Sequence, residues 1–324
     1  MKFKEKDDPS LTQVRINQKF TCAAVVFKSS YWIVSLKDLR GLTEHTFDTN
    51  IVFCEMYENS NLLFIVLEEN PCRVCVWDDS KKKEVEHLLF TSPIRRLIVR
   101  LNFLTVWTEE GTLIVTELIN FRVKTKMKLK MPAETIIDSP VKYESLIGWN
   151  YDSKGDLYLW DFVKNSTREV ELHKKPIKFW VFDRNGHFVA SLNKGSIVKV
   201  YDIQKNKTHE YWLNYSDVDI FGLAFNFTSE LLAVVERSGV LKVFLVSSGE
   251  TERGKAMFGL MREKPIIIAQ ESFVDFDCFW TSANELVLFS LKNSAFRVAI
   301  DPERKSAYFA KGPERLVKLK DSYN

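Results

Sequence analysis

Short stretches in which apolar and polar residues alternate recur along the chain, and each is typical of a half-buried β-strand. The clearest series is RVCVWDD, GTLIVTEL, GDLYLWDF, GSIVKVYDI and GVLKVFLV. Its aromatic or equivalent position falls at Trp77, Thr116, Trp160, Tyr201 and Phe244, at steps of 39, 44, 41 and 43 residues. A repeat of about forty residues predicts one structural unit that is used several times.

Two further apolar segments precede most members of this series. NLLFIVLE, NFLTVWTE, ESLIGWN, HFVASL and ELLAVVE stand directly before them, and PIRRLIVRL, IKFWVFD and DIFGLAFN stand before those. Three strands and a variable fourth are typical of a WD-type β-propeller blade. No convincing amphipathic helix interrupts the pattern.

The sequence therefore predicts an all-β fold, a seven-bladed WD-type β-propeller. The blades are expected at residues 20–45, 47–86, 88–130, 132–172, 174–211, 217–267 and 270–310. We expect the strand near Val14 to Phe20 to complete the last blade. We also expect a single cooperative domain over residues 1–324, monomeric within some larger complex, because closing a sheet circle removes exposed edges.

Composition narrows the class of protein. The chain has 324 residues, of which 45% are hydrophobic and 27% charged, with a formal net charge of +3. This charge is too small to indicate nucleic-acid binding. No apolar run is long enough for a transmembrane segment, and the N-terminus does not resemble a signal peptide.

The chemistry-bearing residues do not form an enzyme motif. The five histidines lack metal-ligand spacing, and we expect no catalytic residues, no metal and no cofactor. Cys72 and Cys75 form a C-x-x-C, but the segment Arg73 to Trp77 reads as a strand, so we interpret both as ordinary strand cysteines. Five cysteines without a secretory signal favour a reducing, cytoplasmic location.

A P-loop spacing occurs once, in SSGETERGKAMFGL. Gly249, Gly254 and Lys255 match G-x-x-x-x-G-K, but Ala256 stands where a hydroxyl would hold magnesium. Glu250 would repel phosphate, and no βαβ pattern surrounds the segment. We therefore interpret the match as a coincidence.

At this level of detail the chain resembles the PROPPINs, seven-bladed autophagy propellers that bind phosphoinositides. The resemblance covers most of the chain and rests on three segments: KVYDIQKNKTHEYWLNYSDVDIFGLAFNFTSELLAVVERSGVLKVF, RVCVWDDSKKKEVEHLLFTSPIRRLIVRLNFLTV and FRVAIDPERK. They are similar to the family's fifth-to-sixth blade junction, its second-to-third junction and its seventh-blade ending. The first of the three is the most specific.

The same junction also shows a departure from the family. PROPPINs carry Phe-Arg-Arg-Gly there, and the two arginines point into two lipid pockets. This chain has Tyr211, Trp212, Leu213 and Asn214 at those positions. Tyr211 is expected in the core. Neither Trp nor Leu can replace the planar, forked donors of Arg in binding phosphate.

The resemblance also identifies two sets of supporting positions. The first-pocket positions are His173, Ser196 and Lys199, which keep family-like types, and Leu192, which replaces a serine. The second-pocket positions are Val235, Glu236, Val240 and Lys242, where the family has mainly hydroxyl residues and histidine. Glu236 is expected to add an unfavourable negative charge. The alternative for Ser196, Lys199 and Lys242 is that they are ordinary outer-strand residues.

In the family, the loop after the third strand of the sixth blade inserts into membranes. Here that loop combines basic and apolar side chains: Lys255, Met257, Phe258, Leu260, Met261, Arg262 and Lys264. This mixture suits a membrane interface or a protein contact. In the alternative, Phe258, Leu260 and Met261 pack onto the blade as its fourth strand.

Three functions follow as hypotheses. The first is a scaffold in autophagy or endolysosomal traffic with degraded lipid pockets, whose partners include an autophagy lipid-transfer protein of the kind PROPPINs recruit. The short segment LEENPCRV weakens the match at the family's site for that partner. The second is a lipid reader, peripheral on endolysosomal or pre-autophagosomal membranes, that uses His173, Lys199 and the basic loop. The third is a propeller subunit of an unrelated assembly.

Overall fold

A computed structural model describes residues 11–129, 135–151, 155–193, 197–213, 220–236, 241–246, 266–268, 276–290, 294–301 and 306–315. These residues form seven four-stranded sheets and contain no helix. The predicted all-β chain of seven four-stranded blades is confirmed.

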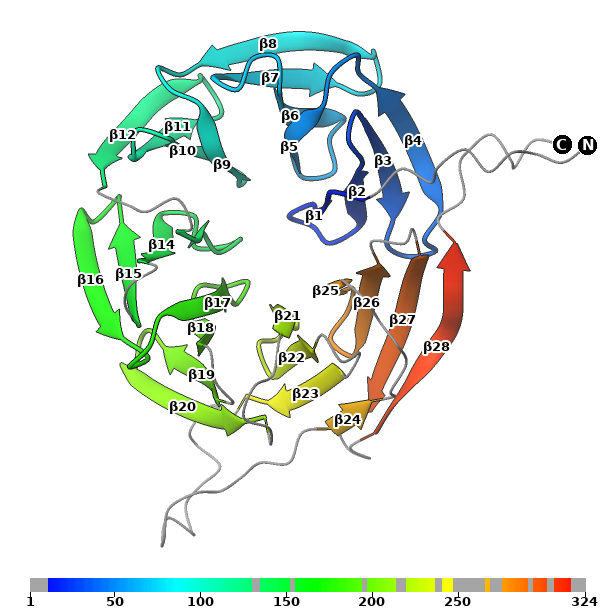
Figure 1. Ribbon diagram of the computed structural model, residues 1–324, viewed down its shortest axis with the longest axis vertical. Coiled ribbons are helices and arrows are strands. Elements are labelled where there is room, and N and C mark those ends of the chain that lie inside the picture. The colour runs from blue at the N-terminus through cyan, green and yellow to red at the C-terminus, as the bar shows by residue number, and fades with distance from the viewer. Residues whose placement is uncertain are drawn as a thin grey trace, which may run out of the picture. The chain divides into compact units, whose positions relative to one another are not determined.

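The chain divides into two compact units, residues 1–126 with 289–296 and 313–324, and residues 127–288 with 297–312. The first three sheets (Figure 1) consist of β1 (Gln13–Ile16), β2 (Cys22–Val26), β3 (Ser30–Ser35) and β4 (Gly41–Thr46); β5 (Ile51–Met56), β6 (Leu62–Leu67), β7 (Arg73–Asp78) and β8 (Lys83–Leu89); and β9 (Ile94–Val99), β10 (Phe103–Thr108), β11 (Thr112–Glu117) and β12 (Arg122–Lys128). The expectation of one cooperative domain stays a prediction.

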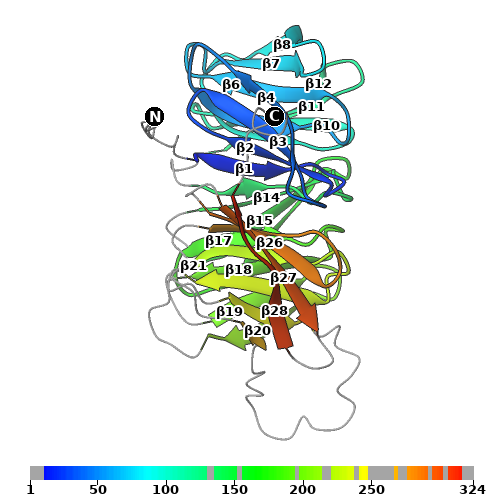
Figure 2. The same ribbon diagram turned by 90° about the vertical axis from the view of Figure 1, so that its right-hand side faces the viewer.

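The other four sheets consist of β13 (Ile137–Asp138), β14 (Leu146–Asn150), β15 (Asp156–Asp161) and β16 (Ser166–Glu171); β17 (Ile177–Phe182), β18 (Phe188–Asn193), β19 (Ile197–Asp202) and β20 (Lys207–Trp212); β21 (Ile220–Phe225), β22 (Leu231–Glu236), β23 (Leu241–Leu245) and β24 (Ile266–Ile268); and β25 (Phe276–Trp280), β26 (Glu285–Ser290), β27 (Ser294–Asp301) and β28 (Ser306–Arg315). Strand order follows chain order in each sheet. Figure 2 shows β17, β18, β19 and β20 one after another across the fifth sheet.

One expectation is wrong. The N-terminal strand β1 pairs with β2, Val14 opposite Val25, and the last sheet has four strands of its own. The turn between β1 and β2 is stabilised locally, because the side chain of Asn17 accepts hydrogen bonds from the backbone N–H groups of Thr21 and Cys22. Closing this short hairpin costs less chain entropy than pairing with a strand at the far end of the sequence.

The period of the sequence has a structural counterpart in a recurrent bulge. The first strands of the second, fifth and sixth sheets start at a buried isoleucine, Ile51, Ile177 or Ile220, and the register shifts directly after it. A bulge at this place increases the local twist of the strand.

A second recurrent feature closes the outer hairpins. Asp78, Asp161 and Asp202 end the third strands of their sheets, and each accepts backbone hydrogen bonds from residues two or three positions later. The turns then pass through left-handed backbone at Lys82, Asn165 and Asn206. These aspartate-closed turns are the structural reason for the repeated W-D or Y-D ending.

The core of the second unit lies between adjacent sheets. Its fourth and fifth sheets enclose a cluster that includes Leu159, Trp180 and Tyr201. Its fifth and sixth sheets enclose another that includes Leu192, Leu223 and Phe244. Leu192 and Leu213, two of the positions singled out from the sequence, belong to this second cluster.

Candidate functional site

The positions expected to correspond to the family's two arginines are Trp212, the last residue of strand β20, and Leu213, which directly follows it. Tyr211 is 4% exposed and meets Phe244 edge-on, with ring centroids 5.4 Å apart. Its expected core position is confirmed. Leu213 is fully buried in the same cluster, together with Leu192 and Ile220. The second arginine position is therefore part of the hydrophobic core. The side chain of Trp212, and all of Asn214, lie outside the described residues.

The second-pocket positions form a buried ion pair. The side chains of Glu236, at the end of β22, and Lys242, on β23, are 4% and 3% exposed, and their charged groups are in direct contact. The Lys242 Nζ also donates a hydrogen bond of 2.8 Å to the backbone carbonyl of Leu213. Val235, beside them, is buried, and Val240 lies outside the described residues.

Two expectations for these positions are wrong. Glu236 does not add an uncompensated negative charge, because Lys242 neutralises it inside the protein. Lys242 is not an outer-strand residue, because β23 is the third strand of its sheet and the lysine side chain is buried. A buried lysine needs such a partner, since burial of an unpaired charge is strongly unfavourable.

The first-pocket positions form a looser polar cluster. His173 Nε2 lies 3.0 Å from the hydroxyl of Ser191, a fully buried residue that sequence reasoning missed. The Nζ of Lys199 lies 2.9 Å from a carboxylate oxygen of Glu210, and these side chains are 23% and 44% exposed. The sequence analysis also did not identify Glu210. The strand register places Glu210 on β20 directly opposite Lys199 on β19.

These contacts limit the positive charge of the first-pocket cluster. Burial, and secondarily the nearby Lys199 ammonium, lower the pKa of His173 to about 4, so its imidazole is neutral at pH 7. Lys199 is paired with Glu210, and Leu192 lies in the core. Ser196 lies outside the described residues.

The backbone at His173 is fixed by hydrogen bonds and by close packing against Gly155. Its N–H and that of Leu172 both donate to the carbonyl of Gly155, each at 3.0 Å. A Cβ on Gly155 would lie only 1.7 Å from the His173 carbonyl oxygen, so this position requires glycine.

The loop candidates Lys255, Met257, Phe258, Leu260, Met261, Arg262 and Lys264 lie outside the described residues, as do Gly249 and Gly254. The fourth strand of the sixth sheet is β24, with Ile266 opposite Val243. The described fourth strand therefore consists of other residues than Phe258, Leu260 and Met261.

Within the described part of the chain, no three His, Cys, Asp or Glu side chains are grouped as a metal site would need. No described helix has the length and apolarity to cross a membrane. The five cysteines are free thiols, and burial raises the pKa of Cys75 to about 12, which keeps it protonated.

No known family model matches this chain. It is 22% identical over 271 residues to SVP1-like protein 2 of Pichia angusta, covering 77% of this chain and 74% of the relative. It is 24% identical over 281 residues to autophagy-related protein 18 of Mycosarcoma maydis, covering 75% of this chain and 61% of the relative.

Solved structures agree over nearly the whole chain. Kluyveromyces lactis Hsv2 superposes with a TM-score of 0.80 at 16% identity, over 96% of this chain and all of that chain. KlAtg21, solved in complex with the coiled coil of AgAtg16, superposes with a TM-score of 0.77 at 14% identity, over 93% and 98% of the two chains. The predicted β-propeller fold is confirmed.

The curated relatives support membership of the PROPPIN family, and the solved structures show that this chain shares their fold. The sequence departs from the PROPPINs in one respect, because it contains no Phe-Arg-Arg-Gly. At the positions expected for the motif and its two pockets, the structure has a core leucine at Leu213, a buried ion pair between Glu236 and Lys242, and a neutral histidine at His173.

Proposed function

We propose that this PROPPIN is a non-catalytic scaffold that acts through protein contacts in autophagy or endolysosomal membrane traffic. Its phosphoinositide pockets no longer recognise a headgroup with useful affinity. It associates peripherally with the membranes on which its partners act, and direct contact with lipid contributes less to this association than protein contacts do.

The observation that carries this proposal is the burial of Leu213 in the core between the fifth and sixth sheets. A side chain at this position cannot reach a headgroup, and it carries no donor. The Lys242 ammonium next to it is directed to Glu236 and to the Leu213 carbonyl, so it is not available to a phosphate. Each lost charge-assisted contact is worth about 1.5–3 kcal/mol, so two such losses weaken headgroup binding by at least about a hundredfold.

The relatives support the autophagy setting and the emphasis on protein contacts. One is named an autophagy-related protein, and one solved neighbour binds the coiled coil of another protein. We propose that this chain likewise recruits protein partners, among them an autophagy lipid-transfer protein.

Vesicle flotation at physiological salt tests the lipid half of the proposal. Vesicles with phosphatidylinositol 3-phosphate or its 3,5-bisphosphate should retain no more protein than phosphatidylserine vesicles of equal charge. Residual binding should fall with added salt, and Lys255→Glu or Phe258→Asp should remove it if the 247–265 loop is the contact. Lys37→Glu, on an exposed turn of the first sheet, is the matched charge control.

Affinity purification of the full chain tests the protein half and should recover stable partners. Micromolar binding to one phosphoinositide, with none to phosphatidylserine at equal charge, would refute the proposal and support the lipid-reader hypothesis. Partners drawn only from an unrelated assembly would support the third hypothesis.

A further inference from the structure

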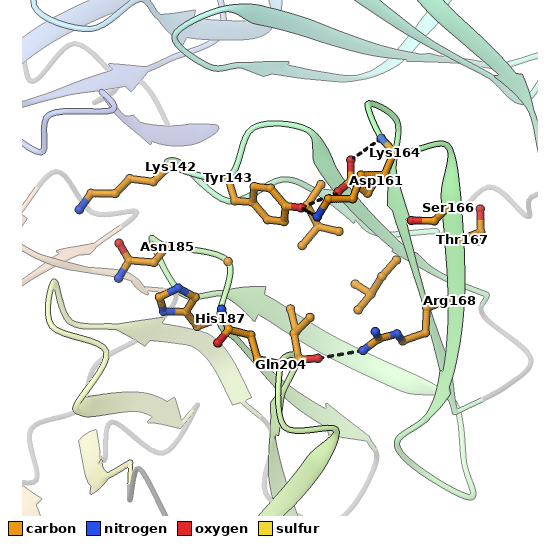
Figure 3. A pocket seen from close by; sticks show the side chains of 14 residues that line it. Lys142, Tyr143, Asp161, Lys164, Ser166, Thr167, Arg168, Asn185, His187 and Gln204 are labelled. Atoms are coloured by element: carbon orange, nitrogen blue, oxygen red, sulfur yellow. Dashed lines mark hydrogen bonds and ion pairs between the residues drawn. The ribbon is translucent and has the colours of Figure 1, made fainter.

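A pocket of about 780 Å³ lies between the fourth and fifth sheets, within the second unit (Figure 3). This volume is in the range of ordinary ligand sites. None of the residues singled out from the sequence lines it. Sequence reasoning missed it because its walls come from four turns and one edge strand that are spread along the chain.

The turns that form the pocket are held by buried aspartates. Asp161 accepts hydrogen bonds from the backbone of Val163 and Lys164, and Asp202 does so from Gln204. Asp183 accepts from the backbone N–H groups of Asn185, His187 and Phe188 and from the hydroxyl of Ser229. The pocket is therefore preorganised, which reduces the entropy cost of binding.

A close backbone contact adds to this rigidity. Gly186 has a φ of +75°, and a Cβ there would lie 3.0 Å from both Pro140 and Tyr143. The Lys142 N–H donates to the Arg184 carbonyl at 2.9 Å. The two turns on this side of the pocket are thus packed against each other.

The charges around the pocket are mainly positive. Lys142, Lys164 and Arg168 are exposed cations, and Asp161 is the carboxylate among the lining residues. Asp161 is already engaged, because Tyr143 donates to it at 2.5 Å and Lys164 lies 3.3 Å from it. Burial by itself would raise the pKa of Asp161, but the hydrogen bonds from Tyr143 and Lys164 keep this pKa below its usual value.

The cations do not converge on one point. In Figure 3, Lys142 lies at one end of the pocket, and Lys164 and Arg168 lie towards the other. Leu146 and Leu159 are buried lining residues, and Ile203 is half-buried. A compact anion could not reach both ends, whereas an extended chain with an apolar side chain between acidic ones could reach both ends and cover the apolar lining.

The edge strand β16 favours a peptide further. Its first three residues, Ser166, Thr167 and Arg168, line the pocket and are exposed. β16 is the last strand of its sheet, so its outer edge can pair with an added strand. Arg168 donates to the Ile203 carbonyl at 2.8 Å and so places its guanidinium at the mouth of the pocket.

We propose that this pocket binds an extended acidic peptide segment of a partner protein, with an apolar side chain placed between Tyr143 and Ile203. The carboxylates of the peptide pair with Lys142 at one end and with Lys164 and Arg168 at the other. The inference rests on the proposed scaffold function and names the chemistry of one of its partners.

A peptide-display selection tests the proposal while the partner protein is still unidentified. Short random peptides are selected on the purified full chain. Peptides with net negative charge and at least one apolar residue should be enriched. In fluorescence anisotropy, the best peptide should bind Lys142→Glu/Lys164→Glu at least about tenfold more weakly.

Three variants make this test specific. Lys142→Arg/Lys164→Arg should retain binding, and so should Lys37→Glu/Lys126→Glu, which makes the same charge change at exposed sites of the first unit. Arg168→Gln should weaken binding, and its thermal unfolding midpoint shows whether loss of the bond to Ile203 has disturbed the fold.

Three outcomes would overturn the proposal. The selection could show no enrichment of acidic peptides, or the double glutamate variant could bind the best peptide as well as the wild type does. In the third, the two lysines would be needed for binding to phosphatidylserine vesicles but not for binding to peptides. Failure here is separable from failure of the scaffold function. If affinity purification recovers the same partners with Lys142→Glu/Lys164→Glu, the scaffold proposal stands and this pocket is not the docking site.

Discussion

In the sixth sheet, Lys242 keeps its charge but directs it to Glu236 inside the protein, whereas in the fifth sheet Lys199 stays partly exposed and pairs with Glu210. The first arrangement is closed, because both partners are buried and Leu213 packs beside them. The second remains partly open to solvent. The sixth-sheet pair is thus enclosed in the protein, whereas the fifth-sheet pair is a partly exposed polar contact.

This difference has an energetic consequence. A buried pair costs desolvation and is strongly destabilised when one partner is removed, whereas an exposed pair contributes little. The sixth-sheet positions should therefore be essential to stability and unavailable to lipid. Substitutions at the fifth-sheet positions, Lys199 and Glu210, should cost little stability. At these positions we expect that a substitution can produce weak anion binding.

The largest effect is expected for Leu213→Arg, which restores the family's charge at a position that is now core. It removes apolar packing and buries an unpaired cation, so the free energy of unfolding should fall by about 5 kcal/mol. Urea titration measures this. Val163→Arg, on a residue that is 62% exposed, is the control and should change little. A stable Leu213→Arg that binds phosphoinositide would show that the pocket is latent and not closed.

The next largest effect concerns the ion pair. Lys242→Met or Glu236→Gln alone should each cost about 3–5 kcal/mol, because each leaves one charge buried without its partner. The double variant Glu236→Gln/Lys242→Met should cost less than the sum, and a double-mutant cycle on unfolding free energies gives the coupling. Additive losses would mean that the pair is not coupled as its geometry indicates.

A smaller effect should appear as pH dependence at His173. Its pKa is about 4 in the folded chain against an ordinary value of 6.5, so between these values the unfolded chain binds a proton that the folded chain does not. This contribution to stability is full above about pH 6.5 and is lost as the pH falls to about 4, by at most about 3 kcal/mol. Unfolding free energies of the wild type and His173→Asn, measured across this range, should converge as the pH falls. Parallel curves would contradict this.

The smallest effect is expected for Glu210→Gln, which removes the partner of Lys199. Stability should change by less than about 1 kcal/mol, because the glutamate side chain is 44% exposed. Binding to phosphatidylserine vesicles should rise by about three- to fivefold, since one cation is released. Glu171→Gln, an exposed residue of β16, is the matched control. Equal flotation of both variants would show that Lys199 does not contact anionic surfaces.

Sequence pattern alone predicted the seven blades, because alternation along each strand and the turn residues between strands are local properties. The resemblance to the PROPPINs led to the expectation of a core position for Tyr211, which its burial confirms, and to the prediction that both family arginines are replaced, which stays a prediction. The N-terminal strand was assigned to the wrong sheet, since strand partners depend on which hairpin closes and not on the strand's own residues.

The tertiary structure decided what the altered positions do. Lys242 neutralises Glu236 because neighbouring strands bring the two side chains together in a buried space, and no pattern along one strand shows such a pairing. The pocket between the fourth and fifth sheets was decided in the same way, because Lys142, Arg168 and Gln204 line one pocket only when the two sheets pack face to face. Local residue chemistry thus determined the elements of this protein, and contacts between distant segments determined which charges remain available to a partner.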